Sequence, residues 1–195
     1  MMMMYADMIL LPIYLQNGLG FTAFEAGLLL LPGAIINALL SPFTGKLFDK
    51  LGAKPVFIIG LLFIIPSMWA VTDLTAETSF MYLMIRTIIL RIGLSFITMP
   101  INTAGLNSLP KQLGTHGSAV NNTVRQIAGA IGTAVVITIY TTQSANHAVQ
   151  MPNATAQTLS MLGSNDAYYF MTILSIAALV LTFFMPKKKR ALEKQ

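Results

Sequence analysis

Three charged residues, Asp7, Arg86 and Arg91, lie within segments that are otherwise apolar. A charge at the depth of a lipid bilayer is costly, so such a residue normally faces a cavity, pairs with an opposite charge or carries a proton. Asp7 lies about nine residues, or roughly 13 Å at about 1.5 Å per residue, before the end of the first apolar segment. Because burial favours the neutral form of an acid, we expect Asp7 to bind and release a proton. The alternative is a static bond to the backbone or to Arg91.

The two arginines lie in the fourth apolar segment, residues 80–106. They are five residues apart, so on a helix of about 3.6 residues per turn they point about 140° apart and do not readily share a partner. Arg86 is nearer the outer end, and we expect it to extend outward toward Asp73 or Glu77. Arg91 is too deep for that, which makes it a candidate for substrate binding or proton coupling.

Uncharged polar residues add further candidates for a polar cavity. The fifth apolar segment, residues 117–140, opens with a polar stretch that contains Asn121, Asn122, Arg125 and Gln126. Four such side chains within six residues surround the inner half of a helix, which suits a helix that lines a wet cleft or packs on polar partners. The candidates for substrate or proton coupling are Asp7, Asn37, Arg91, Asn102, Arg125 and Gln126.

The sequence offers no cluster typical of bond-making chemistry or metal binding. It has no cysteine and only two histidines, His116 and His147, so we expect no metal site. A membrane enzyme would need a histidine, cysteine or carboxylate cluster at one depth, and Asp7 is the only acid clearly within an apolar segment. We therefore expect no catalytic residue, no enzyme activity and no cofactor.

The composition predicts an all-α, polytopic membrane protein. Of the 195 residues, 55% are hydrophobic and 10% are charged, whereas an average soluble domain has about 25% charged residues. A spanning helix needs about 20 mostly apolar residues. Six segments approach this length: 1–16, 24–44, 55–72, 80–106, 117–140 and 167–186. The first is short and starts without a polar flank, so we expect its beginning to be missing from this chain. Residues 1–186 then form one six-helix bundle and residues 187–195 a basic tail.

The basic residues indicate which ends of the helices face the cytoplasm. Nine of the twelve lie in three regions, 45–54, 107–116 and 187–195, and the connections between them carry none. The positive-inside rule places these three regions in the cytoplasm, in the cell membrane. The tail anchors to anionic lipid rather than to nucleic acid, because its charges directly follow an apolar segment. The polar stretch 141–166 is predicted to be a long outward loop, and its sequon at Asn153 is a weak signal.

Several stretches, taken in chain order, resemble the fourteen-helix drug:proton antiporters of the major facilitator superfamily, the EmrB/QacA-like branch. They are Pro12–Gln16, Gly27–Gly33, Gly45–Lys54, Arg91–Leu94, Met99–Ile101 and Gly117–Gly132. Gly45–Lys54 is similar to the second copy of the loop signature called motif A. Ile92 departs from the family, which often has glycine there. Eight helices of the family, with the first motif A and the antiporter signature, have no counterpart in this chain.

The resemblance implies that the chain is the C-terminal bundle of a proton-driven multidrug exporter. Its partners would be the bilayer, a missing N-terminal bundle, protons, and lipophilic or cationic drugs. Asp49 would contact a helix N-terminus and a nearby base of that bundle and latch one conformation. Gly45 and Gly52 would permit the turn, while Lys46, Lys50 and Lys54 lie at the lipid surface. The alternative is a self-assembling six-helix channel or accessory subunit.

Overall fold

The structure is a computed structural model that describes residues 1–75, 78–107 and 114–184; the side chains of 102–107 and 114–115 are not described. Over these ranges the chain is α-helical and contains no strand. The helices are α1 (Met2–Ile13), which continues as the π-helix η1 (Tyr14–Gly18), then α2 (Ala23–Leu51), α3 (Ala53–Trp69), α4 (Phe80–Asn107), α5 (Gly114–Gln150) and α6 (Ala156–Phe183). The all-α expectation is confirmed.

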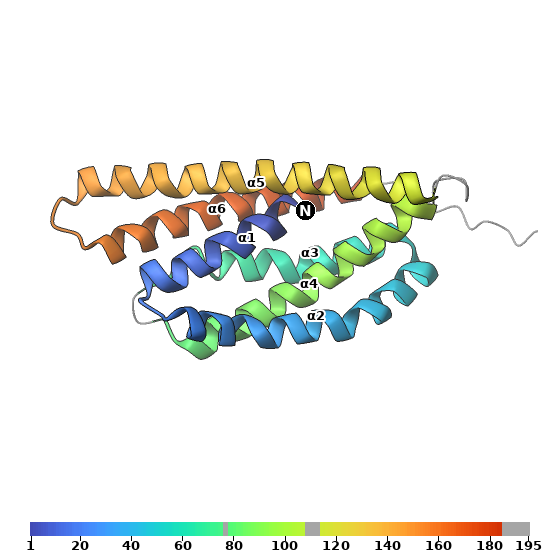
Figure 1. The fold of residues 1–195 in the computed structure, drawn as a ribbon, viewed down its shortest axis with the longest axis horizontal. Helices are drawn as coiled ribbons and strands as arrows, with labels where there is room; N and C mark the ends of the chain where they lie inside the picture. The colour runs from blue at the N-terminus through green and yellow to red at the C-terminus, as the bar shows by residue number, and fades with distance from the viewer. Residues whose placement is uncertain (76–77, 108–113, 185–195) are drawn as a thin grey trace, which may run out of the picture.

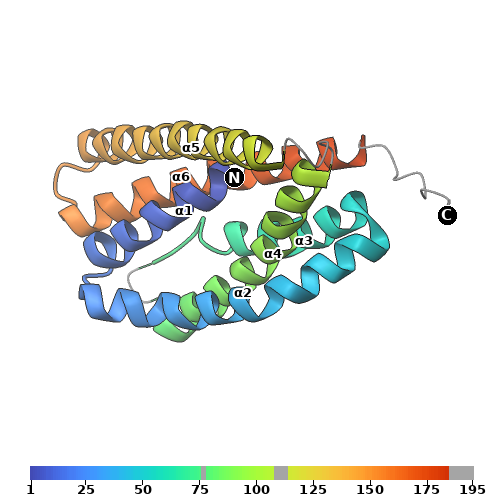
Figure 2. The ribbon, with the colours of Figure 1, turned by 45° about the vertical axis from the view of Figure 1, so that its right-hand side comes forward.

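The helices form two groups of three that pack side by side (Figures 1 and 2). In one group α4 packs on α2 and α3, and in the other α5 packs on α6 and α1. The contact of α3 with α6 joins the groups, together with smaller contacts of α4 with α5 and of α2 with η1. Successive helices run in opposite directions along the bundle, so the α2–α3 turn lies at the same end as the end of α6 (Figure 1).

Local sequence explains where two of the long helices begin and end. Thr22 caps α2: its hydroxyl accepts a bond from the backbone N–H of Glu25 at 3.2 Å, and the Glu25 carboxylate accepts one from the Thr22 N–H at 2.8 Å. The helix ends at Gly52, whose φ of +82° lies in the left-handed region that favours glycine. α6 begins after Thr155, whose hydroxyl accepts from the Thr158 N–H.

Four of the helices are long and apolar enough to cross a membrane: α2, α4 over 80–101, α5 over 116–150, and α6. The 17-residue α3 is apolar but shorter than that criterion. Large apolar side chains such as Phe24, Leu39, Val149 and Phe184 are exposed on the outer faces. Such surfaces suit contact with lipid, since backbone groups are satisfied within each helix.

The α5–α6 connection corrects the expected long outward loop over 141–166. α5 continues to Gln150 and α6 begins at Ala156, so the connection is only 151–155. The polar side chains of this region serve the contact between the two helices instead. Tyr140 and Ser160 share a hydrogen bond of 2.9 Å, and His147 Nε2 lies 2.8 Å from Asp166 Oδ2.

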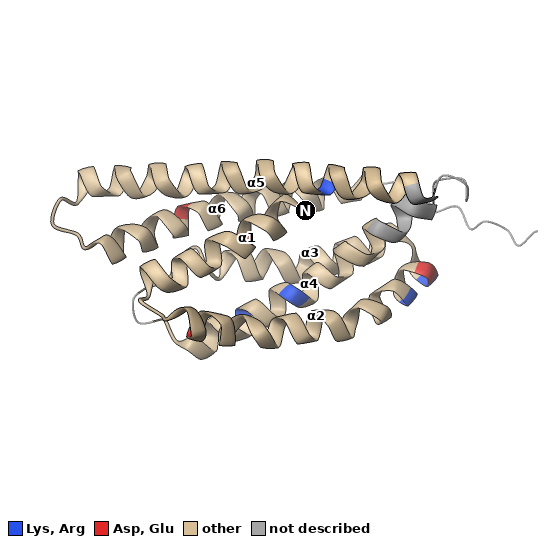
Figure 3. Cartoon of the chain, in the orientation of Figure 1, with Lys and Arg blue, Asp and Glu red and all other residues tan. Residues whose placement is uncertain are grey.

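The polar 45–54 segment is also mostly helical rather than a loop. Its first seven residues form the last two turns of α2, and the chain reverses only at Gly52. Gly45 therefore lies inside a helix and takes no part in the turn, contrary to the expectation that both glycines permit it. Figure 3 shows charged residues gathered at this end of α2 and sparse along the rest of the bundle.

Candidate functional site: a buried ion pair and an open groove on two faces of α1

The acid in α1 and the first arginine of α4 form a buried ion pair. Arg86 Nη1 donates to Asp7 Oδ1 at 3.1 Å, and the two side chains are 2% and 1% exposed. This corrects two expectations. Arg86 points into the bundle rather than outward toward Asp73, while Glu77 lies outside the described residues. Asp7 pairs with Arg86 and not with Arg91.

Two further helices complete the surroundings of this pair. The Tyr168 hydroxyl of α6 donates to the same Asp7 Oδ1 at 3.2 Å, and the Arg86 guanidinium lies 5.0 Å from the centre of the Tyr168 ring. From α3, the Ser67 carbonyl accepts from Arg86 Nε at 2.9 Å, and Met68 Sδ lies 3.6 Å from Nη2. We call Asp7, Arg86 and Tyr168 the acid cluster. It joins α1, α4 and α6 inside the apolar core, with α3 holding the arginine.

The acid cluster leaves one acceptor unused. Asp7 Oδ2 is buried and has no hydrogen-bond partner among the described residues. A buried oxygen without a partner carries a desolvation penalty that a proton or an ordered water removes. Arg–carboxylate pairs are frequently bidentate, with both oxygens engaged. The observed contact therefore engages Asp7 through one oxygen only.

The helix that carries Asp7 is irregular just beyond it. Pro12 has no N–H, so the carbonyl of Met8 lacks its usual helical donor. The chain then widens into η1, and short π-helical turns of this kind are frequent at functional sites. α1 is thus a short, interrupted helix whose position depends on side-chain contacts.

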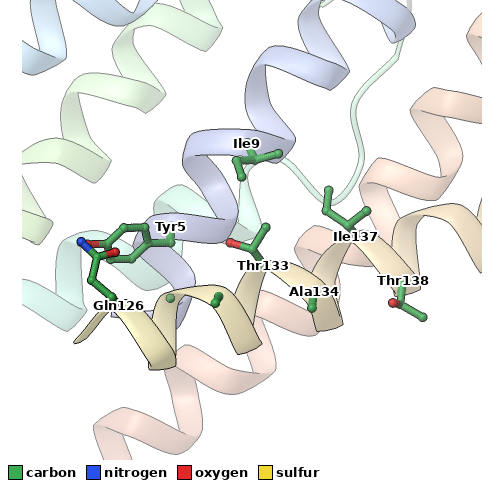
Figure 4. A pocket seen from close by; sticks show the side chains of 9 residues that line it. Tyr5, Ile9, Gln126, Thr133, Ala134, Ile137 and Thr138 are labelled. Atoms are coloured by element: carbon green, nitrogen blue, oxygen red, sulfur yellow. The ribbon is translucent and has the colours of Figure 1, made fainter. Parts of the chain in front are cut away.

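A groove lies on the opposite face of α1, between α1 and α5 (Figure 4). Its volume is about 590 Å³, and it is lined by Tyr5, Ile9, Gln126, Gly129, Ala130, Thr133, Ala134, Ile137 and Thr138. Most of the lining is apolar, and the polar groups are a phenol, an amide and two hydroxyls. A mostly apolar concave surface with a few polar groups is typical of a small-molecule site. Gln126, one of the candidates from sequence, lies here.

Arg91 and Asn37 meet at the α2–α4 contact. The Asn37 side-chain amide donates to the backbone carbonyl of Arg91 at 3.0 Å. A Cβ at Gly33 would lie 2.9 Å from Arg91 Cγ, so the arginine stem packs directly on the α2 backbone. Arg91 Nε is buried without a hydrogen-bond partner among the described residues. These two candidates lie in a helix contact apart from the acid cluster.

The remaining candidates are not brought into the acid cluster. Arg125 is half-buried on α5, one residue before Gln126. The side chain of Asn102 lies outside the described residues. The structure therefore gathers Asp7 with two residues that were not on the candidate list, and it gathers Gln126 with Tyr5.

The motif A-like residues lie at the α2–α3 end of the bundle. Asp49 and Lys50 are exposed, while Gly52 is buried in the turn. Lys54 has a structural contact: its ammonium donates to the carbonyl of Phe183 at 2.6 Å, which caps the end of α6. A Cβ at Gly45 would meet no atom within 4 Å, so this face of α2 is open.

Sequence reasoning missed Tyr168 and assigned Arg86 to the wrong surroundings. Arg86 lies close enough to the end of its helix for its long side chain to reach the membrane surface. The sequence therefore allowed Arg86 to point either outward or into the bundle. Tyr168 stands in a Tyr168–Tyr169 pair, and nothing local distinguishes the buried tyrosine from the exposed one. The signal that could have found Arg86 is charge balance: a buried Asp7 requires a base at its own depth.

Long apolar helices, an apolar exterior and a buried ion pair define a multi-pass α-helical membrane protein. Residues 1–133 match the sequence profile of the Major Facilitator Superfamily, and the chain belongs to that family. Members of this family are transporters, so the chain is not an enzyme.

The relatives are similar over nearly the whole chain. The lincomycin resistance protein LmrB of Listeria monocytogenes is 41% identical over 194 residues, which cover 96% of this chain and 41% of LmrB. The uncharacterized MFS-type transporter YhcA of Bacillus subtilis is 39% identical over 93% of this chain and 42% of its own length. The multidrug export protein EmrB of Escherichia coli is 28% identical over 77% of this chain and 30% of its own length. The chain thus spans about two fifths of the length of the first two relatives.

Proposed function

We propose that this chain is the C-terminal bundle of a proton-coupled exporter of lipophilic or cationic small molecules. Two of the relatives above are named for lincomycin resistance and multidrug export, which supports the substrate class. The chain covers about two fifths of LmrB, which supports a further bundle N-terminal to it. In this proposal the protein lies in the cell membrane with its C-terminus in the cytoplasm.

The observation that carries the proton coupling is the buried Asp7 carboxylate with its unpartnered Oδ2. With Asp7 ionised, the Asp7–Arg86 pair carries no net charge. When Asp7 takes up a proton on Oδ2, Arg86 keeps the Ser67 carbonyl and the Tyr168 ring as partners. The acid can therefore change its charge without leaving the arginine bare, as a reversible proton carrier requires.

The open surfaces of the bundle suit a partner bundle. In the most apolar stretches of α2 and α5, only 17% of the residues are buried within this chain. In the corresponding stretch of α4, 44% of the residues are buried. The exposed carboxylate of Asp49 lies near the end of α2, where it would meet the positive N-terminus of a partner helix. Gly45 and Lys50 would lie along the same contact, and the motif would act as a conformational latch.

A resistance assay tests this proposal. The genomic reading frame is extended upstream of Met1, and the long product and the 195-residue chain are expressed separately in a lincomycin-sensitive bacterium. We expect eight further spans upstream and lincomycin efflux from the long product only. An in-frame stop directly upstream, with a ribosome-binding signal before Met1 and efflux from the short chain, would instead favour a self-assembling six-helix channel.

A further inference from the structure

Arg91 carries a positive charge at the middle of a membrane-spanning helix. The apolar span of α4 covers 22 residues, Phe80–Ile101, and Arg91 lies close to its centre. At about 1.5 Å per residue, either end of this span is about 15 Å away, which is too far for an arginine side chain to bring its charge out of the bilayer. A charge at this depth normally pairs with an opposite charge or faces a wet cavity.

Packing against α2 fixes the position of Arg91. A Cβ at Gly33 would lie 2.9 Å from Arg91 Cγ, and one turn further along α2 the Asn37 amide donates to the Arg91 carbonyl at 3.0 Å. Thr87, one turn before Arg91 in α4, faces the same glycine, since a Cβ at Gly33 would lie 3.4 Å from Thr87 Cγ2. Thr87 and Arg91 therefore share the face of α4 that packs on α2.

This face holds two polar atoms that the described residues leave without a hydrogen-bond partner. They are Thr87 Oγ1 and Arg91 Nε, and both atoms are buried. Arg91 as a whole is half-buried, and because its stem packs on α2 and its Nε is enclosed, its exposed part is the outer end of the guanidinium. A guanidinium presents its donors in a planar fork that matches a carboxylate. The threonine hydroxyl adds one more donor, one turn away.

No acid of the described residues balances the charge of Arg91. Two ion pairs occur among these residues, and Arg91 takes part in neither of them. Asp7, the one acid that is buried among them, is already engaged by Arg86 and Tyr168. The counter-charge of Arg91 therefore has to come from outside the described part of the chain, or else water has to surround the guanidinium.

We propose that Arg91, assisted by Thr87, binds the carboxylate of an aspartate or glutamate at the same depth in the partner bundle. This inference rests on the proposed function, which supplies that bundle, and it names one contact between the two bundles. The strip of α4 beside Arg91, about 80–120° around the helix, carries the exposed side chains of Met81, Ile85 and Met99 and is open to a facing helix.

The proposed substrates disfavour a ligand as the source of this carboxylate. They are lipophilic or cationic, and Arg91 repels a cation at close range. A ligand also leaves after each transport cycle, whereas the charge of Arg91 is permanent and is costly at this depth whenever it has no counter-charge. An acidic side chain of the facing bundle balances the charge in the absence of substrate as well.

The pair would set the depth at which the two bundles meet. Apolar faces lose little when they slide past each other in lipid, whereas an arginine and a carboxylate that separate near the midplane both lose their counter-charge. Arg91 is thus a positioning residue, which acts on the contact between the bundles and touches no substrate. Exchange of the two charges is the readout that a merely structural role would not move.

Thermal unfolding of the purified, ligand-free long product in detergent tests this pairing. Arg91→Met keeps an unbranched stem against Gly33 and removes the charge, so it leaves the facing carboxylate alone. We expect the melting temperature to fall by at least about 2 °C. Each aspartate and glutamate within the upstream spans is then changed to asparagine or glutamine in the Arg91→Met background. One of these second changes should recover most of the loss.

Reversal of the charge makes the test more specific. Arg91→Glu should be less stable than Arg91→Met, because it adds repulsion to the facing carboxylate, and replacement of that acid by arginine should restore the stability of Arg91→Glu. If Arg91→Met does not fold, recovery of a monodisperse protein in the double variants is the readout.

Arg86→Met is the matched control, because its acid lies within this chain. Asp7→Leu should recover the stability of Arg86→Met and should not recover that of Arg91→Met. The upstream acid that recovers Arg91→Met should in turn have no such effect on Arg86→Met.

Three results would overturn the pairing: Arg91→Met as stable as the wild type, a loss that no upstream acid recovers, or Arg91→Glu no less stable than Arg91→Met. The last result would mean that water surrounds the guanidinium. Any of them, found in a long product whose wild type exports lincomycin, leaves the proposed function standing. Recovery by one upstream acid in a protein whose wild type does not export lincomycin would instead overturn the proposed function and leave the pairing.

Discussion

At the scale of single residues, the acid cluster is the feature that separates this bundle from a plain set of apolar helices. A buried ion pair is weak evidence for stability, because desolvation of two charges offsets much of their attraction. Asp7 and Arg86 are 1% and 2% exposed and engage each other through one oxygen only. An ion pair that contributes little to the stability of the fold and leaves Asp7 Oδ2 without a partner suits a protein in which the charge of Asp7 has a functional role.

This view predicts the outcome of removing one or both charges. Asp7→Leu leaves Arg86 buried without its counter-charge and should destabilise the protein by about 3–5 kcal/mol. Asp7→Leu combined with Arg86→Met replaces the pair by apolar groups and should recover most of that loss. Thermal unfolding in detergent measures both variants. A double variant no more stable than Asp7→Leu would show that the pair itself stabilises the bundle.

The sequence predicts a proton-carrying Asp7, with a static bond to the backbone or to Arg91 as the alternative, and an Arg86 that extends outward. It placed a proton-binding acid in the membrane from depth alone, which remains a prediction. It could not choose Arg86 over Arg91, because the choice depends on how α1 and α4 are rotated against each other. That rotation is fixed by packing, such as Arg91 Cγ against Gly33, and not by any local signal.

At the scale of helices, the long apolar segments were predictable and the polar helix ends were not. The expected fourth helix, 80–106, matches α4, whose apolar stretch over 80–101 is long enough to be recognised from sequence. The polar ends of α5 and α6 looked like a loop, yet tertiary contacts such as Tyr140–Ser160 keep them helical. Polarity outside the bilayer does not distinguish a loop from a helix that extends beyond the membrane surface.

The contact between α3 and α4 depends on two glycines that let the backbones meet. A Cβ at Gly93 would lie 2.7 Å from the Gly60 carbonyl oxygen, and a Cβ at Gly60 would lie 2.9 Å from that of Gly93. Because backbone atoms cannot rotate away, Gly93→Ala should force the helices apart and destabilise the protein by about 1–3 kcal/mol.

Gly27→Ala is the matched control for this prediction. A Cβ at Gly27 meets no atom within 4 Å, so the substitution should be neutral or slightly stabilising in helix α2. Thermal unfolding of both variants in the same detergent is the measurement. Equal melting temperatures for Gly93→Ala and Gly27→Ala would contradict the close backbone contact.

At the scale of the whole molecule, alternation of the basic connections predicted the topology. The structure places the α2–α3 turn, the end of α4, the start of α5 and the end of α6 at one end of the bundle (Figures 1 and 3). Which end faces the cytoplasm remains a prediction of the positive-inside rule. The tail beyond residue 184 lies outside the described residues. The acid cluster could not be predicted from the sequence, because it joins α1, α4 and α6 and its members are up to about 160 residues apart in the chain.

Cysteine labelling in intact cells tests the orientation. Asp49→Cys at the α2–α3 end and Asn153→Cys in the α5–α6 connection are both exposed positions in a chain without cysteine. A membrane-impermeant maleimide should label Asn153→Cys in intact cells and Asp49→Cys only after the cells are opened. The reverse pattern would show that the bundle is inserted the other way.

The central claim is that Asp7 carries the proton that drives export. The direct measurement is lincomycin accumulation in proteoliposomes of the long product under an imposed proton gradient, with wild type compared with Asp7→Asn. We predict accumulation by the wild type and none by Asp7→Asn, while Asp7→Asn still exchanges labelled for unlabelled lincomycin, because exchange needs no net proton movement. Gradient-driven accumulation by Asp7→Asn at the wild-type level would contradict the claim.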